Sequence, residues 1–216
     1  MSVCYVYLNR SDDDRMQLRP SIIPIMNFNP ILLDVAERIE TDRLVLRAVM
    51  PGDGRVHFPA LQESLLDLRR HLGHLAWVIE EASLPNSENY CRNMRSGFIK
   101  RENLVYFIYS KSDRSMVGSV GLHRIEWAVP RFEVGYWCRT SAQRQGYVVE
   151  AVNSITAFAF AQLAAKRVEI RADDTNIPSW KVAEKAGFAL EGILRNWDRD
   201  TVSNGLRDLR VYAKTA

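Results

Sequence analysis

The chain has 216 residues, of which 47% are hydrophobic, and a net charge of +3 at pH 7. That length suits one domain around a single core, and so mild a basic excess does not make nucleic acid a default partner. Three cysteines without metal-ligand spacing, no apolar run near the roughly 18 residues of a membrane span and no signal-peptide pattern favour a reduced cytoplasmic protein without a structural metal.

Residues 1–37 differ in character from the rest of the chain. A polar cluster covers residues 11–15, three prolines punctuate the stretch, and no sustained hydrophobic period is present. We expect a peripheral N-terminal extension here, and a single domain over residues 38–216. Met26 can also serve as a start of translation, so the sequence leaves open whether residues 1–25 belong to the native protein.

The domain begins with a predicted strand and two predicted helices. The apolar run at residues 44–46 is strand-like, and a Pro-Gly-Asp-Gly breaker follows at residues 51–54. Leucines at helical spacing predict a helix over residues 58–72. Ser87 is a candidate N-cap for a second helix that contains Phe98.

An antiparallel meander is predicted next. Residues 104–110 are rich in aromatic and β-branched side chains, and residues 111–115 have the composition of a turn. Residues 116–126 and 131–138 predict two more strands, which join near Pro130.

The last part of the chain alternates helices and strands. A helix over residues 146–165 precedes a strand over residues 167–172, which needs this crossover to pair in parallel. A short helix over residues 176–186 is followed by a hairpin of residues 188–196 and 205–214. This order predicts an α/β fold in which helices flank one mixed sheet.

The most informative segment lies between a predicted strand and a predicted helix, at residues 143–148 (Gln-Arg-Gln-Gly-Tyr-Val). Backbone N–H groups at a helix start lack partners, and together with the helix dipole they form a site for a phosphate or pyrophosphate. Gly146 permits the close approach of such a group to the backbone.

This segment resembles the coenzyme A signature of the GNAT superfamily, Gln/Arg-x-x-Gly-x-Gly/Ala. Gln143 and Gly146 match, and Val148 stands where Gly or Ala is usual. Between Arg38 and Tyr212 the chain is also similar to the Rim-type branch, the N-terminal acetyltransferases of ribosomal proteins. The matching pieces, in the same order, are residues 39–47, 117–121, 133–137, 176–179, 185–188 and 191–192.

The resemblance implies a mostly antiparallel mixed sheet with a splayed parallel pair, into which the pantetheine arm of acetyl-CoA inserts. It implies acetyl transfer to a primary amine, with a protein or peptide N-terminal α-amine as first choice, and relatives suggest a homodimer. The residues implied in coenzyme binding are Trp137, Cys138, Arg139, Arg144, Gln145, Gly146, Tyr147, Val148, Asn176 and Ser179.

Acetyl transfer requires a neutral amine, and an α-amino group has a pKa of about 7.7–8.0. A carboxylate acting directly or through water can therefore serve as the base. Glu126 is the first candidate, because it stands where the Rim-type branch carries a catalytic glutamate, and we expect it beside the cleft. Glu133 on the next strand is the second, and His123 is the third, on the face opposite Glu126 by strand alternation.

Other residues bear on the leaving group and the acceptor. Many GNAT enzymes protonate the leaving thiolate with a tyrosine, but this chain has Ala183 at the corresponding position. The resemblance to the Rim-type branch implies instead that Ser179 donates a hydrogen bond to the coenzyme sulfur. Cys138 is most simply a small hydrophobe, so we expect direct transfer without a covalent acetyl-enzyme. By their position in the family pattern, residues 74–77 are expected to contact the acceptor substrate. The tryptophans that can line an acceptor groove or fill the core are Trp77, Trp127, Trp180 and Trp197.

Two other functions stay open. Acetylation of a small amine, such as an antibiotic, a polyamine or an amino acid, favours a closed pocket rich in carboxylates, whereas a peptide acceptor favours an open groove. Binding of acetyl-CoA without turnover is compatible with Val148 and with the replaced tyrosine. A Rossmann-type nucleotide site is disfavoured, because Gly146 lacks partners at G-x-G-x-x-G spacing.

Overall fold

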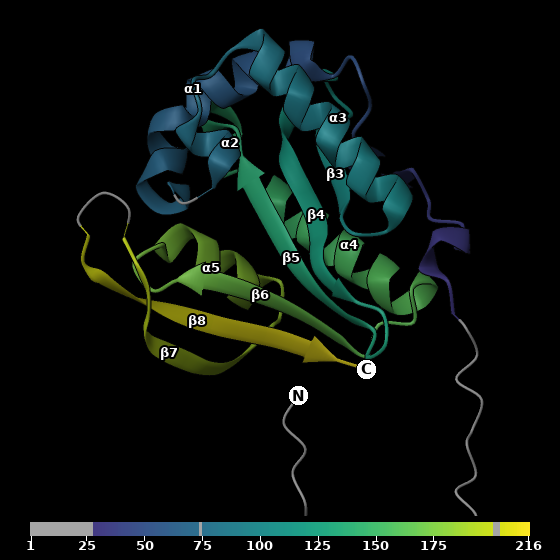
Figure 1. Cartoon of the computed structure of the whole chain (residues 1–216), viewed down its shortest axis with the longest axis vertical. Coiled ribbons are helices and arrows are strands. Elements are labelled where there is room, and N and C mark those ends of the chain that lie inside the picture. The colour runs from purple at the N-terminus through teal and green to yellow at the C-terminus, as the bar shows by residue number, and fades with distance from the viewer. Residues whose placement is uncertain (1–27, 74, 201–203) are drawn as a thin grey trace, which may run out of the picture.

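The computed structural model describes residues 28–73, 75–200 and 204–216. Over these residues the chain forms one eight-stranded sheet in the order β1-β2-β3-β4-β5-β6-β8-β7 (Figure 1). The strands are β1 (Arg38–Glu40), β2 (Leu44–Ala48), β3 (Leu104–Ser110), β4 (Met116–Glu126), β5 (Arg131–Cys138), β6 (Arg167–Asp173), β7 (Ala189–Arg199) and β8 (Leu206–Thr215).

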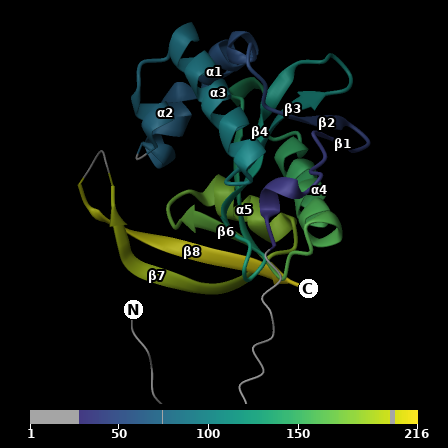
Figure 2. The same cartoon turned by 45° about the vertical axis from the view of Figure 1, so that its right-hand side comes forward.

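Helices cover both faces of the sheet, so the predicted mixed fold is confirmed. The helix α4 packs against β4 and β5 on one face, and α1 and α3 pack against β4 and β3 on the other. In the turned view of Figure 2, the pair β1–β2 and the hairpin β7–β8 lie at opposite edges of the sheet. The helices are α1 (Gly54–Leu72), α2 (Ala76–Ile79), α3 (Leu84–Lys100), α4 (Tyr147–Gln162) and α5 (Ile177–Lys185), with short 3-10 turns at Pro30–Leu32 and Thr140–Ala142.

Two hydrophobic clusters form the core, one on each face. Strand β3 contributes to both, because alternate side chains point to opposite faces of a strand. Tyr106 and Ile108 belong to the cluster that contains Ile155 of α4, whereas Phe107 belongs to the cluster that contains Leu61 of α1. Burial on both faces explains why β3 reads as a continuous apolar run.

The parallel pair β5–β6 is the feature of the sheet that creates space. The two strands pair at only three positions, Arg131↔Arg167, Phe132↔Val168 and Glu133↔Glu169. Beyond that point β5 runs on to Cys138 while β6 continues beside β8, and no further β5–β6 pairing occurs. The strands therefore splay apart, with the crossover helix α4 on one side of the opening.

The start of the second long helix differs from the sequence prediction. Ser83, and not Ser87, is the N-cap of α3: its hydroxyl oxygen accepts a hydrogen bond from the backbone N–H of Asn86 at 3.2 Å. A proline in the first turn fits this earlier start. Ser87 lies inside the helix and is buried, so the prediction that it caps the helix is wrong.

The last part of the predicted extension packs against the domain. Val35 belongs to the core, and the Tyr106 hydroxyl donates to the Ala36 carbonyl oxygen at 2.7 Å. Phe28 lies against Trp127, with ring centroids 5.9 Å apart. The prediction of a peripheral arm for residues 1–27, including the question of a start at Met26, lies outside the described residues. Within the part of the chain that the structure describes, we find no helix long and apolar enough to cross a membrane.

His57 of α1 is completely buried among aromatic rings. Its imidazole stacks on Tyr90 and Phe107 at centroid distances of 4.8 and 5.4 Å, and Trp137 meets it edge-on. Neither ring nitrogen has a hydrogen-bond partner among the described residues. Burial disfavours the charged imidazolium and lowers the pKa of His57 to about 4, so the ring is neutral at neutral pH.

We predict that His57→Phe reduces the loss of stability in mild acid. The pKa of His57 in the folded protein is lowered from 6.5 to about 4. Between these values the unfolded chain binds a proton that the folded protein does not, and the free energy of unfolding falls as the pH falls. From pH 7 to pH 5 this effect amounts to about 2 kcal/mol. Urea unfolding at the two pH values measures it, and an equal loss in variant and wild type would contradict the prediction.

Candidate active site

The loop between β5 and α4 has the geometry of an anion site. Arg144 and Gly146 adopt left-handed backbone conformations, with φ of 62° and 79°, and Gly146 is the N-cap of α4. No side chain caps this helix start, so its first N–H groups are left for an external acceptor. Val148 has its side chain in the core, which explains why a larger residue than Gly or Ala fits at this position.

Helix α1 holds the beginning of the same loop. The Glu63 carboxylate forms an ion pair with Arg139 and accepts a hydrogen bond from the backbone N–H of Ser141 at 2.7 Å. The Ser64 hydroxyl accepts from the backbone N–H of Thr140 at 3.0 Å. The Arg139 side chain is thus directed at α1, and its predicted contact with the coenzyme rests on its backbone.

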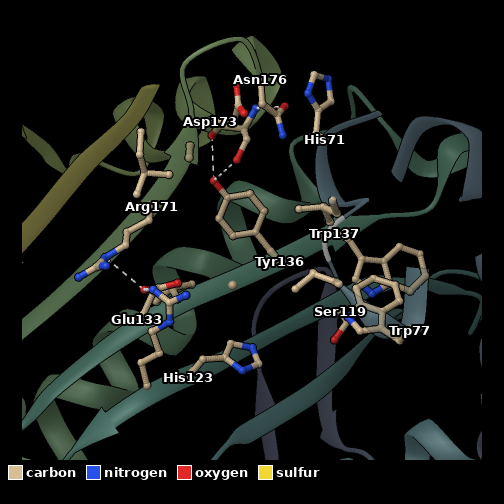
Figure 3. Close-up of a pocket in the computed structure, with 18 of the residues that line it drawn as sticks. His71, Trp77, Ser119, His123, Glu133, Tyr136, Trp137, Arg171, Asp173 and Asn176 are labelled. Atoms are coloured by element: carbon tan, nitrogen blue, oxygen red, sulfur yellow. Dashed lines mark hydrogen bonds and ion pairs between the residues drawn. The ribbon is translucent and has the colours of Figure 1, made fainter. Parts of the chain in front are cut away.

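A cavity of about 470 Å³ lies between α1–α3, the strands β4 to β6 and the β7–β8 hairpin (Figure 3). One part of its wall is aromatic and apolar, with Trp77, Tyr90 and Trp137. The other part is polar and charged, and it includes Glu133 and Arg171. The cavity borders the opening between β5 and β6, because Tyr136 of β5 and Ala172 of β6 both line it.

Glu133 is the candidate base that the structure places in this cavity. Its carboxylate lies 3.2 Å from an Arg124 nitrogen and 3.3 Å from an Arg171 nitrogen, and Figure 3 shows Arg171 directed at it from the neighbouring strand. Burial raises the pKa of Glu133 above its usual range, and the two arginines only partly offset this effect. The group therefore has a greater proton affinity than an exposed glutamate.

His123 lies beside Glu133 on the floor of the same cavity. The two residues face each other across β4 and β5, and both line the cavity. The His123 Nδ1 lies 3.1 Å from the Asn103 Oδ1, within hydrogen-bond distance. Burial lowers the pKa of His123 to about 4, so the imidazole is neutral at neutral pH. The ring packs over Gly121 and Gly135, where any side chain would collide with it.

The expectation that Glu126 lies beside the cleft is corrected by the structure. Glu126 is the exposed last residue of β4, and its carboxylate accepts a hydrogen bond from the backbone N–H of Ala128 at 3.1 Å. It does not line the cavity. The strand register shifts between His123 and Glu126, so simple alternation does not hold there, and the opening lies toward the other end of β5.

Tyr136, Ser179 and Asn176 meet where the cavity reaches α5. The Tyr136 hydroxyl donates to the Ser179 carbonyl oxygen at 2.8 Å and lies 3.2 Å from the Ser179 Oγ. The Asn176 Oδ1 caps α5 by accepting from the backbone N–H of Ser179. Sequence reasoning assigned roles to Ser179 and Asn176 but missed Tyr136. Its only signal was its place in the matched string at residues 133–137.

The remaining candidates divide between cavity and core. Burial raises the pKa of the Cys138 thiol to about 11, so it stays protonated and is a poor nucleophile at neutral pH. Trp77 and Trp197 line the cavity, whereas Trp127 and Trp180 do not. The acceptor prediction for residue 74 lies outside the described residues. In the ranges that the structure covers, no cluster of three or more histidine, cysteine, aspartate or glutamate side chains could hold a metal ion.

A family model described as an acetyltransferase (GNAT) domain matches residues 43–189. The match spans the sheet from β2 to the first residue of β7, including the loop at the start of α4 and the splayed strands. The chain therefore belongs to the GNAT acetyltransferase family, and it is an N-acetyltransferase.

Two curated relatives illustrate the range of similarity. An uncharacterized N-acetyltransferase, YoaA, of Bacillus subtilis is 22% identical over 159 residues, which cover 74% of this chain and 86% of the relative. A ribosomal-protein-serine acetyltransferase of Escherichia coli is 29% identical over 108 residues, which cover 50% of this chain and 59% of the relative.

Solved structures of similar proteins share the fold. The microcin C7 self-immunity acetyltransferase MccE, in complex with acetyl-CoA and AMP, has a TM-score of 0.74 at 20% identity, over 82% of this chain and 94% of that one. The ribosomal L7/L12 α-N-protein acetyltransferase RimL, in complex with coenzyme A, has a TM-score of 0.75 at 20% identity, over 83% of this chain and 98% of that one. At this level of identity the likeness establishes the GNAT fold.

We predict that Gly135→Ala displaces the His123 imidazole. A methyl group at Gly135 would lie 2.9 Å from Cδ2 and 3.1 Å from Nε2 of His123, so the ring must turn away from Asn103. Urea unfolding should show a destabilisation of about 1–3 kcal/mol, and the NMR signals of the His123 ring should shift. The control is Gly192→Ala, because an added Cβ there meets nothing within 4 Å. Equal effects from both substitutions would contradict the prediction.

Proposed function

We propose that this protein transfers the acetyl group of acetyl-CoA directly to the N-terminal α-amine of a protein or peptide. The observation that carries the proposal is the opening between β5 and β6, which borders the cavity and is flanked by the crossover helix α4, whose start has no side-chain cap. A thioester held in this opening meets an amine that enters from the cavity.

The residues around the opening fit coenzyme A. The loop from Arg144 to Val148 offers unpaired N–H groups at a positive helix end, which suit a pyrophosphate. From Val134 to Cys138 the β5 edge that faces β6 has no strand partner, which suits the amides of a pantetheine arm. The solved complexes of MccE with acetyl-CoA and of RimL with coenzyme A support this donor by analogy.

The charges of the cavity favour a peptide α-amine over a polycationic small molecule. A small polycation needs unpaired carboxylates, but three of the four carboxylates that line the cavity are paired with arginines. Glu133 pairs with Arg124 and Arg171, and Asp173 and Asp198 both pair with Arg207. The similarity to a ribosomal-protein-serine acetyltransferase points the same way. A peptide N-terminus, which carries a single amine, suits a cavity that is charged on one side and apolar on the other.

The chemistry follows from three side chains. Glu133, whose raised pKa suits proton uptake, accepts a proton from the acceptor ammonium directly or through water. When bound, acetyl-CoA supplies the acetyl group as a thioester. A backbone N–H near Cys138 holds the developing oxyanion. Ser179, whose Oγ lies 3.2 Å from the Tyr136 hydroxyl, donates a hydrogen bond to the departing sulfur. As the N–C bond forms and the C–S bond breaks, the second amine proton passes to the thiolate, which leaves as coenzyme A thiol.

The test is mass spectrometry of peptides with varied N-terminal residues, incubated with acetyl-CoA and the protein. We expect acetylation of the α-amine, and a decrease in kcat/KM of about 100-fold for Glu133→Gln, which is within the range for loss of a general base. Glu126→Gln is the matched control, since that exposed carboxylate lies outside the cavity, and it should change kcat/KM less than twofold.

Two outcomes would contradict the proposal in different ways. If no peptide is acetylated although coenzyme A binds, the acceptor is a small amine or the protein only binds the coenzyme. If Glu126→Gln and Glu133→Gln lower the rate equally, the assignment of the base to Glu133 is wrong.

We predict a smaller effect for Ser179→Ala. A hydrogen bond contributes about 1 kcal/mol, and a thiol with a pKa of about 8.5 leaves without strong acid assistance. We therefore expect kcat to fall by about fivefold, with little change in the KM for acetyl-CoA. Steady-state kinetics together with thermal unfolding provide the measurement. A lowered melting temperature with unchanged kcat would assign Ser179 a structural role in α5 instead.

A further inference from the structure

The turn between β1 and β2 is bonded to the first turn of α4, more than one hundred residues later in the chain. The Glu150 carboxylate receives three hydrogen bonds from this turn: from the Thr41 hydroxyl at 2.6 Å, from the Arg43 backbone N–H at 3.1 Å and from the Arg43 Nε at 2.7 Å. A second guanidinium nitrogen of Arg43 lies 2.6 Å from the same carboxylate. Sequence analysis found this segment only as part of a family match and gave it no role.

Arg43 also contacts the anion-binding loop itself. Its Nη1 donates to the Gln145 carbonyl oxygen at 3.0 Å, and its guanidinium lies over the Tyr147 ring, 4.9 Å from the centroid. An added Cβ at Gly146 would lie 3.5 Å from an Arg43 nitrogen. The side chain therefore contacts Gln145 and Tyr147, on either side of Gly146, as well as Glu150.

These contacts have two consequences for the anion site: they support its backbone and they neutralise a nearby negative charge. The left-handed conformation of Arg144 needs external support, because such backbone is unfavourable for a non-glycine residue. Glu150 places a negative charge in the first turn of α4, where it would repel a pyrophosphate unless it is neutralised. The Arg43 guanidinium bonds the Gln145 carbonyl oxygen, which supports the loop, and it pairs with Glu150, which neutralises the carboxylate.

We propose that Arg43 is a positioning residue for coenzyme A binding, which fixes the loop from Arg144 to Tyr147 and neutralises Glu150. It acts through the loop, because its nitrogens are already engaged by Glu150 and Gln145. The inference rests on the proposed use of acetyl-CoA and extends it to a residue outside the coenzyme signature.

Calorimetric titration of coenzyme A into the protein tests this without any acceptor. Arg43→Met should raise the Kd for coenzyme A tenfold or more, since it removes charge-assisted hydrogen bonds from the loop. Arg43→Lys should recover only part of the affinity, because an ammonium cannot bond the carboxylate and the carbonyl in the same fork. Arg38→Met is the matched control. It breaks the exposed ion pair of Arg38 with Glu40, two residues further along the same strand β1, and should leave the Kd unchanged.

A double substitution separates positioning from general destabilisation. In Arg43→Met the unpaired Glu150 charge remains, so adding Glu150→Gln should restore part of the coenzyme affinity, which a purely structural role would not do. In steady-state kinetics the KM for acetyl-CoA should rise while kcat stays within twofold.

Two kinds of result would contradict this proposal. An unchanged Kd in Arg43→Met, or a fall in kcat at constant KM, would overturn the role of Arg43. If the wild-type protein itself does not bind coenzyme A, the proposed function fails first.

Discussion

The three-residue parallel pairing of β5 with β6 is the constraint on which the rest of the molecule depends. A parallel pair requires a crossover, and here the crossover is α4. The same crossover places a helix start, with its unpaired N–H groups, beside the point where the strands part. Had pairing continued to Cys138 and Asp173, the sheet would be closed, and the loop would face no opening. The short register thus creates the space and the anion site together.

Desolvation determines the direction of the pKa shifts of Glu133 and His123, which lie side by side in the cavity. Burial disfavours the charged form of both neighbours: it raises the pKa of Glu133 and lowers that of His123. The positive charges of Arg124 and Arg171 lower the pKa of Glu133 and so partly offset the effect of burial. Arg171 in turn pairs with Glu169, so charges of alternating sign continue along β6. Positive and negative side chains therefore nearly balance in the charged part of the cavity wall.

Much of the fold could be predicted from the sequence, because local periodicity carries it. The crossover helix, its preceding strand and the glycine loop at residue 146 are all encoded within short windows. The base was harder to predict, since the placement of Glu126 rested on the family resemblance and on its position at the end of a predicted strand, and neither shows at which end of β5 the sheet opens. Tyr136 and Asn103 were missed because their roles arise from partners at distant positions in the chain.

Helix α1 connects the two halves of the site mechanically. Its middle, at Glu63 and Ser64, is bonded to the loop that precedes α4, and its C-terminal end, at His71 and Leu72, lines the cavity. A helix behaves as a nearly rigid rod over such a length, so a ligand that shifts one end also moves the other. Linkage then requires reciprocity: whatever factor the acceptor imposes on donor affinity, the donor imposes on acceptor affinity.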